Sequence, residues 1–229
     1  MSRPLSHQEA ARNNKMKICG LLAGVLMLTA ASCGSELDAA SRSAVAAGWS
    51  VRIDAFDDGS EATRFVLHDD GLEAKPGPNA CLWHPDLRTS GAYRLSVDVT
   101  HLDSGEHPHG AGLTFGGQDV HGEGQRYTYF LVRSDQKFLI KSRRGDETED
   151  LVSWTEHEAL SAEDPQGVTR NRLSVEVGGG ELSFLINGVE VHRTTSPTLA
   201  TEGQVGLRLV HDIHVKFGEI ALEPIDGSR

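Results

Sequence analysis

Hydrophobic and polar residues alternate with a period of two along most of the chain after residue 49, which predicts β-strands. The clearest alternation covers residues 92–102, where every second side chain is expected in the core: Tyr93, Leu95, Val97 and Val99. Shorter runs of the same kind predict further strands, at 49–53, 64–68, 72–75, 80–84, 151–154, 172–177, 182–186, 189–192, 204–210 and 214–222.

Three more strands are predicted in direct succession, at residues 110–117, 126–133 and 137–143. In the second, Phe130 and Val132 are expected to face the core with Thr128, and in the third Phe138 and Ile140 do so. The residues between them along each strand then point to the opposite side of the sheet, where they can contact a ligand.

Turn signals separate these strands at short intervals and long helical patterns are scarce, which places the chain in the all-β class. Asn187-Gly188 stands between two apolar runs and predicts a hairpin, because both residues tolerate positive φ. Residues 69–71, Asp-Asp-Gly, predict a second hairpin. We therefore expect one globular β-domain over residues 49–229.

Residues 1–32 predict a secretory signal. Lys15 and Lys17 precede an uncharged apolar run at 18–31 that is too short to span a bilayer, and small residues then lead to Cys33. This resembles a bacterial lipoprotein signal, which implies lipidation of Cys33. The residues from Met16 onward already form a complete signal, so Met16 is an alternative start. A plain secretory peptide cut nearby is the other interpretation.

Residues 33–48 are rich in Ser and Ala and predict a tether between the lipidated cysteine and the domain. In lipoproteins of this type an Asp after the cysteine would indicate inner-membrane retention, so Gly34 favours the outer membrane or the cell surface. Cys81 is the one cysteine left in the domain, so no internal disulfide is expected, and its apolar surroundings predict a buried thiol.

The chain is acidic, with a net charge of −11. Without residues 1–32, which carry four basic residues and one acidic residue, 18 basic and 32 acidic residues remain, a net charge of −14. Such a surface repels nucleic acid and anionic headgroups, so neither is an expected partner. Contact with a membrane is expected through the lipid anchor.

The last third has the most specific pattern, RNRLSVEVGGGELSFLINGVEV followed by GQVGLRL and VKFGEIAL. It resembles concanavalin A-like jelly-roll sandwiches and, more narrowly, the bacterial 3-keto-disaccharide hydrolase domain family. The matching positions are Asn171, Asn187, Gly188, Gly203, Gly206, Phe217 and Ile220. The resemblance covers about residues 49–223 in the order of elements, and it implies a sandwich of two antiparallel sheets.

Catalysis is less clearly indicated. The family's catalytic residues have no assignable counterparts here, and the Glu-x-Asp-x-x-Glu motif typical of glycoside hydrolases with this jelly roll is absent. The nearest acidic run, at 146–150, is predicted to be a solvated loop.

A saccharide-binding surface is predicted on the side of the three central strands that faces away from the core. Tyrosine rings stack on the apolar faces of sugars, and Arg and Lys donate hydrogen bonds to their oxygens. The residues expected there are Tyr127, Tyr129, Arg133, Lys141 and Arg143, extended by Thr114 and Asp98. The alternative is that the tyrosines pack beneath a loop.

The loop at 118–125 is expected to add polar groups at the rim of this surface, Asp119 and Glu123 among them. Histidines gather in the same region, and imidazoles with carboxylates suit zinc. Their spacing matches no known metal site, so no metal and no cofactor is predicted. These histidines are His101, His107, His109 and His121.

Together these features predict an exported, lipid-anchored β-sandwich that binds a saccharide without catalysis of its own. One alternative is a glycoside hydrolase acting on 3-keto-sugars or related saccharides, with its acid and base drawn from Asp98, Asp119, Glu123 or a nearby histidine. Another is a surface adhesion or assembly module, which would present a large exposed apolar patch.

Overall fold

The computed structural model describes residues 48–53, 64–75, 79–103, 107–195, 198–210 and 213–226. These residues form fifteen strands joined by turns and loops. They contain no helix of the length and apolarity needed to cross a membrane. The predicted signal, the predicted lipidation site Cys33 and the tether up to residue 47 lie outside the described residues.

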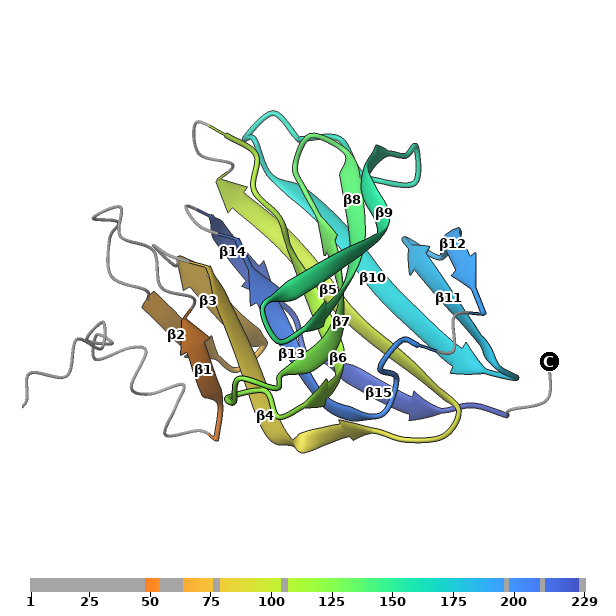
Figure 1. Cartoon of the computed structure of the whole chain (residues 1–229). Coiled ribbons are helices and arrows are strands. Elements are labelled where there is room, and N and C mark those ends of the chain that lie inside the picture. Colours follow the sequence, from red (N-terminus) through yellow and green to blue (C-terminus); the bar gives the residue numbers. More distant parts are fainter. Residues whose placement is uncertain are drawn as a thin grey trace, which may run out of the picture. The chain divides into compact units, whose positions relative to one another are not determined.

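The strands form two antiparallel sheets (Figure 1). One sheet contains β1 (Ser50–Ile53), β4 (Ala80–Thr89), β6 (Ala111–Gln118), β7 (Arg126–Val132), β8 (Lys137–Arg144), β9 (Glu147–Glu156) and β13 (Gly203–Leu209). The other contains β2 (Arg64–His68), β3 (Gly71–Lys75), β5 (Tyr93–Asp103), β10 (Thr169–Gly178), β11 (Glu181–Ile186), β12 (Val189–Thr194), β14 (His214–Phe217) and β15 (Ala221–Pro224).

The order of strands in the seven-stranded sheet is β1-β4-β13-β6-β7-β8-β9. In the eight-stranded sheet it is β12-β11-β10-β5-β14-β3-β2, with β15 also paired to β5. Many neighbours in space are therefore distant in sequence, as β13 shows by pairing with both β4 and β6. The three successive strands predicted from the sequence, now β6, β7 and β8, do lie side by side.

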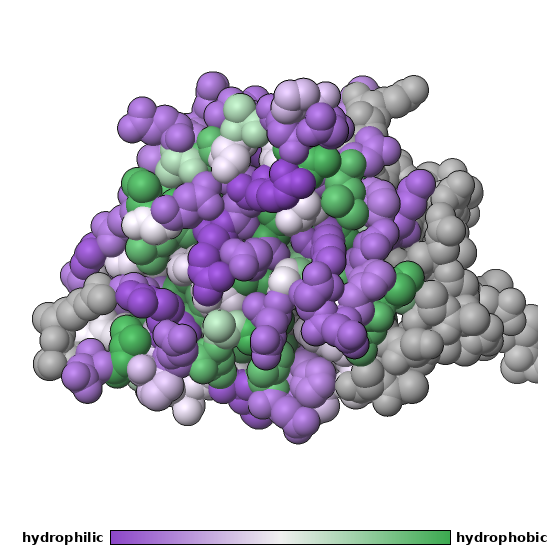
Figure 2. Space-filling view, turned by 180° about the vertical axis from the view of Figure 1, so that it is seen from behind, coloured by the Kyte–Doolittle hydropathy of each residue, from purple (hydrophilic) through white to green (hydrophobic). Residues whose placement is uncertain are grey.

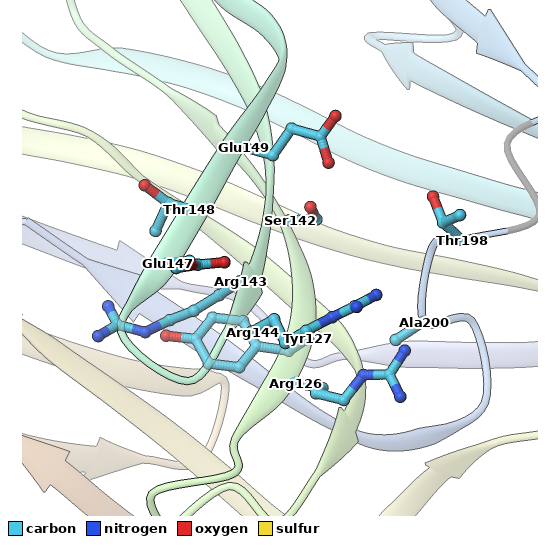
Figure 3. A pocket seen from close by; sticks show the side chains of 10 residues that line it. All are labelled: Arg126, Tyr127, Ser142, Arg143, Arg144, Glu147, Thr148, Glu149, Thr198 and Ala200. Atoms are coloured by element: carbon cyan, nitrogen blue, oxygen red, sulfur yellow. The ribbon is translucent and has the colours of Figure 1, made fainter.

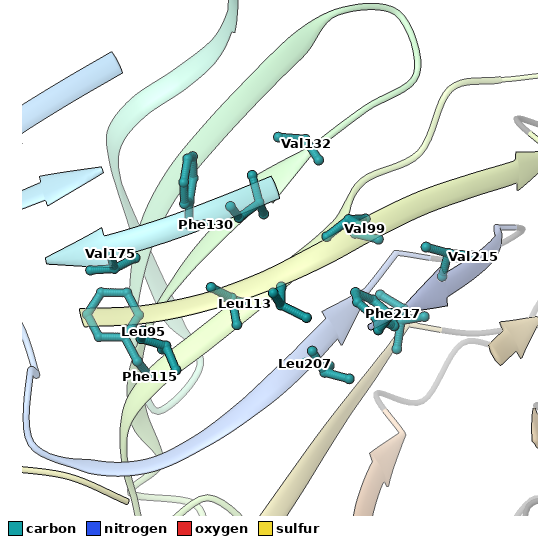
Figure 4. Packing of buried hydrophobic residues seen from close by; sticks show 14 of the residues in the cluster. Leu95, Val99, Leu113, Phe115, Phe130, Val132, Val175, Leu207, Val215 and Phe217 are labelled. Atoms are coloured by element: carbon teal, nitrogen blue, oxygen red, sulfur yellow. The ribbon is translucent and has the colours of Figure 1, made fainter. Parts of the chain in front are cut away.

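The main core lies between the two sheets. Figure 4 shows side chains from both sheets packing together, among them Leu95 and Val175 of the eight-stranded sheet and Phe115 and Phe130 of the seven-stranded sheet. The Phe130 and Phe184 rings meet edge to face, with centroids 5.4 Å apart. The predicted inward phases of β5, β7 and β8 are confirmed, because the apolar side chains assigned to the core are all buried there.

The acidic run at 146–150 is mostly strand, so its prediction as a loop is wrong. β9 begins at Glu147 and pairs with β8 along the edge of the sheet. One side of an edge strand has no neighbouring strand to hydrogen-bond with, and such strands tolerate charged side chains. Here some of the charges on β9 are balanced by opposite charges on β8. Lys141 of β8 and Asp150 of β9 form an ion pair of 2.8 Å.

The sequence analysis groups His101 with the histidines of a loop region, and the structure corrects this. β5 continues to Asp103, so His101 is a strand residue whose imidazole is fully buried. Its Nδ1 lies 3.3 Å from the Thr169 hydroxyl. Burial disfavours the imidazolium and lowers the pKa of His101 from 6.5 to about 4.

This burial predicts a loss of stability on mild acidification. Between pH 6.5 and pH 4 the unfolded chain binds a proton at His101 that the folded chain does not, so the stability present above pH 6.5 falls as the pH drops. From pH 7.5 to pH 5.5 the parent protein should lose about 1 kcal/mol more than a His101→Gln variant. Urea unfolding at the two pH values measures this difference. Equal losses in parent and variant would contradict the buried neutral imidazole.

Candidate functional site

The outer face of the seven-stranded sheet carries a second apolar cluster. Side chains that alternate with the core residues of β4, β7 and β8 form it with a residue of the β6–β7 loop. Its members are Cys81, Trp83, Val120, Tyr127, Tyr129, Leu131 and Leu139, with Trp154 and Val210 packed against them; we call this set the outer-face cluster. Strand glycines make room for it, since a Cβ at Gly117 would lie 2.7 Å from the Trp83 ring.

The two tyrosines of this cluster face away from the main core, as their phase predicts, but they are buried. Tyr127 is 1% exposed and Tyr129 is 5% exposed. The Trp83 and Tyr127 rings meet edge to face with centroids 5.3 Å apart. The rings therefore contribute mainly to packing, and they do not form an open platform on which a sugar stacks.

Arg208 of β13 also belongs to this face, and the sequence analysis did not single it out. It is 7% exposed, and its Nη1 donates to the Cys81 sulfur at 3.0 Å and to the Tyr127 hydroxyl at 3.2 Å. The guanidinium also lies 5.1 Å above the centroid of the Tyr129 ring. The alternation in GQVGLRL could have predicted its direction. Leu207 and Leu209 point inward, so Arg208 between them must point outward.

Burial and polar neighbours shape the chemistry of the outer-face cluster. Burial raises the pKa of Tyr127, and the adjacent Cys81 acts in the same direction. On this face, two polar atoms are buried without a hydrogen-bond partner among the described residues: Trp83 Nε1 and Thr114 Oγ1. The register places Thr114 beside Tyr129 and confirms that it belongs to this face.

The basic residues predicted for this face lie at its margin, and each has a partner within the chain. Arg133 Nε donates to Asp135 at 2.9 Å, and its guanidinium lies 4.9 Å from the centroid of the Trp154 ring. Arg143 Nε donates to the Gly145 carbonyl at 2.9 Å. With Lys141 already paired to Asp150, these three side chains are held in place by the protein itself.

The loop after β6 is organised by Asp119. Asp119 has a φ of 46° and accepts a hydrogen bond from the Gly124 amide at 3.0 Å, while its carbonyl accepts from Gly122 at 2.9 Å. Its carboxylate thus shapes the turn. Glu123 is exposed, and His121 Nε2 lies 3.0 Å from the Ser50 hydroxyl. Within the described part of the chain, no group of three or more His, Cys, Asp or Glu side chains is placed to hold a metal ion.

Asp98 does not extend the predicted binding face, and that expectation is corrected. It belongs to β5, whose Val97 and Val99 point inward, so Asp98 points out from the eight-stranded sheet on the other side of the sandwich. There it pairs with Arg172 at 3.1 Å. Because the main core separates Asp98 from the loop that carries Asp119 and Glu123, these three carboxylates do not form one acid–base site.

Ion pairs are the characteristic feature of the outer face of the eight-stranded sheet. Examples are Lys216 with Asp70 at 2.8 Å, Arg193 with Glu181 at 2.7 Å, and Arg172 with Asp98 at 3.1 Å. The side of the molecule shown in Figure 2 is likewise mostly hydrophilic, with hydrophobic residues in small groups.

A cleft of about 410 Å³ opens at the ends of β7, β8 and β9, beside residues 198–200. The strand register builds its wall, because Arg126, Arg144 and Glu147 are cross-strand neighbours in one row. Ser142 and Glu149 follow two residues along on the same face. Figure 3 shows Arg126 and Arg144 pointing toward the side where Thr198 and Ala200 lie, whereas the Tyr127 ring and Arg143 point the opposite way.

The cleft brings together two residues of the predicted site, Tyr127 and Arg143, with several that the sequence analysis did not select. The sequence predicts Arg126 as the first residue of a strand, Arg144 just after the end of another, and Glu147 and Glu149 in a loop. Their convergence depends on the β7–β8–β9 register, which the sequence alone did not reveal. The polar side chains in these two rows of the wall are Arg126, Ser142, Arg144, Glu147 and Glu149, and Thr148 and Thr198 also line the cleft.

Comparisons with known proteins identify the fold. No protein family model and no curated protein matches the chain. Among solved structures, the chain is similar to the carbohydrate binding module CBM66 from Bacillus subtilis, with 12% identity and a TM-score of 0.55 over 77% of this chain and 95% of that one. The chain is a jelly-roll β-sandwich. The fold prediction is thus confirmed, whereas the narrower resemblance to the 3-keto-disaccharide hydrolase domain family stays a prediction.

Two further similarities show the same fold in other settings. The exoplasmic/lumenal domain of VIP36, in a form bound to Ca²⁺ and Man3GlcNAc, has 9% identity and a TM-score of 0.56 over 80% of this chain and 86% of that one. A GlcNAcα1-4Gal-releasing endo-β-galactosidase from Clostridium perfringens has 11% identity and a TM-score of 0.52 over 86% of this chain and 62% of that one. One fold therefore serves binding domains and an enzyme, so function must be argued from the site.

Proposed function

We propose that this protein binds a saccharide, without catalysis, in the cleft at the ends of β7, β8 and β9. The observation that carries the proposal is the set of polar side chains on the cleft wall. Those of Ser142, Glu147 and Glu149 make no hydrogen bond or ion pair with any described residue, and neither do Arg126 and Arg144. These groups are available to a ligand, unlike the basic residues at the margin of the outer-face cluster.

The chemistry of the cleft wall suits a sugar. A sugar hydroxyl both donates and accepts hydrogen bonds, so a saccharide needs both kinds of partner in a small space. Guanidinium groups supply donors, the carboxylates of Glu147 and Glu149 supply acceptors, and the Ser142 hydroxyl supplies both. The cleft also has the volume of a small-molecule site.

The similar structures add support of a different kind. Among the proteins that share the fold are a carbohydrate binding module and a domain seen with a bound saccharide, so this architecture is compatible with saccharide binding. The argument for binding in this chain still rests on the cleft itself.

The binding test uses the full chain, with a glycan array to find a saccharide and calorimetry to measure its affinity. A Ser142→Ala, Glu149→Gln double variant removes one hydroxyl and replaces one carboxylate acceptor with an amide donor, and it should weaken binding about tenfold. A Glu223→Gln variant changes an exposed glutamate on the other sheet and should bind like the parent. Binding at background level, or unchanged binding by the double variant, would refute the proposal.

Export and lipid anchoring form the second part of the proposed function. The basic residues, the short apolar run and the small residues before Cys33 support them. Two or more acyl chains hold a domain durably on a membrane, which would place the cleft at the outer membrane or cell surface. Growth with radiolabelled palmitate should label the parent and leave a Cys33→Ser variant unlabelled. An unlabelled parent would refute the anchor.

A further inference from the structure

Arg126 and Arg144 form an unusual pair on the wall of the cleft. Their Cα atoms are register partners on β7 and β8, so two like charges stand directly opposite each other, and Glu147 of β9 is the register partner on the other side of Arg144. Such like-charge pairs are destabilising in antiparallel sheets. Both guanidinium groups point to the side of the cleft where Thr198 and Ala200 lie (Figure 3). An anionic group bound between them would remove the repulsion.

Most other arginines of the described chain have a partner, and Arg88, exposed on β4, is an exception. Arg94, Arg133, Arg170, Arg172 and Arg193 each form an ion pair with a carboxylate. Carboxylates are also in excess over basic residues in this chain. The side chains of Arg126 and Arg144 nevertheless make no hydrogen bond or ion pair with any described residue.

We propose that the ligand of the cleft is an acidic saccharide, bound through the carboxylate of a uronic acid residue placed between Arg126 and Arg144. This inference rests on the proposed function and names its substrate class. A guanidinium presents a planar fork of donors that matches a carboxylate, and two forks hold it from both sides.

The Glu149 carboxylate sets the orientation of the sugar ring. In Figure 3 the Glu149 carboxylate is directed away from the Arg126 and Arg144 guanidinium groups. A uronate carboxylate at the arginines therefore avoids Glu149, while hydroxyl groups elsewhere on the ring donate to it. A ligand with its charge at the other end would face the Glu149 carboxylate and be rejected.

Calorimetry on the full chain with a galacturonic acid trisaccharide and the matching galactose trisaccharide tests this inference. The acidic trisaccharide should bind at least about tenfold more tightly, since a hydrogen bond to a charged group contributes more than a neutral one. Raising the salt concentration should weaken the acidic ligand more than the neutral one.

The variants Arg126→Gln and Arg144→Gln locate the effect. Each should weaken binding of the acidic trisaccharide about tenfold or more while changing the neutral one much less. Arg126→Gln should also melt at the same temperature as the parent or higher, because the like-charge repulsion is gone. Arg88→Gln is the matched control, since Arg88 is exposed, lies on β4 outside the cleft and makes no hydrogen bond or ion pair with a described residue.

The outcomes separate the two proposals. Equal affinity for both trisaccharides, with loss of binding in the Ser142→Ala, Glu149→Gln variant, would overturn the acidic ligand and keep saccharide binding. A preference for the acidic trisaccharide that survives both arginine variants would also overturn this inference. No binding of any saccharide would overturn both proposals.

Discussion

Replacing Gly206 with alanine is expected to destabilise the domain by about 3 kcal/mol or more, enough to leave a large unfolded fraction. Gly206 lies on β13 between β4 and β6, in the interior of the seven-stranded sheet. An added Cβ would lie 2.1 Å from the Leu82 carbonyl oxygen and 3.0 Å from the Thr114 hydroxyl. The oxygen is part of a neighbouring strand, so relief requires a shift of the sheet.

Urea unfolding of the Gly206→Ala variant, followed by circular dichroism, measures this loss. Gly180→Ala is the matched control, because Gly180 has a φ of 82° in a turn and a Cβ there would meet nothing within 4 Å. Only the left-handed backbone opposes alanine at that site, at about 1 kcal/mol. Equal stability of the two variants would contradict this prediction, because it would mean that the sheet accommodates a Cβ at Gly206 at little cost.

The local part of the fold was readable from the sequence because alternation is a local signal. Tyr93, Leu95 and Val97 are buried at the predicted phase on β5, and Asn187-Gly188 turns β11 into β12 at the predicted place. Alternation also sorted the residues of β7 correctly between the main core and the outer face. For these elements, side-chain phase and turn chemistry agree.

The pairing of distant strands was not readable. Asp98 and Tyr127 both point away from the main core, but they lie in different sheets, and phase alone does not distinguish the two faces. The cleft shows the same limit. Arg126, Arg144 and Glu149 converge only once β7, β8 and β9 are in register, and charged residues on an edge strand lack the apolar alternation that reveals a strand.

The burial of side chains on the outer face could not be predicted from the sequence either, because the pattern of an amphipathic strand is the same whether its second face is open or covered. The tyrosines there proved buried against Trp83 and beneath Arg208. This matters for testing function. Removing Tyr129 would mix a packing loss with any loss of binding, whereas Ser142 and Glu149 on the cleft wall can be changed with little effect on the core.

Replacing Trp83 with alanine is expected to destabilise the protein by about 3 to 5 kcal/mol, as for a large aromatic residue in a main core. The Trp83 ring is fully buried, meets Tyr127 edge to face and lies over the strand glycines Gly117 and Gly206. If the outer-face cluster were instead an open platform for ligands, removal of the ring would change stability by about 0.5 kcal/mol or less. The two interpretations thus differ severalfold in one measurement.

Urea unfolding of the Trp83→Ala variant decides between them. Leu67→Ala provides the control, because Leu67 is 42% exposed on β2 and its truncation should cost far less than that of a buried side chain. A loss for Trp83→Ala no larger than that for Leu67→Ala would mean that the cluster does not act as a core. The expected large loss would make the outer-face cluster a second core that holds β7 and β8, and with them the cleft wall, against β4 and β13.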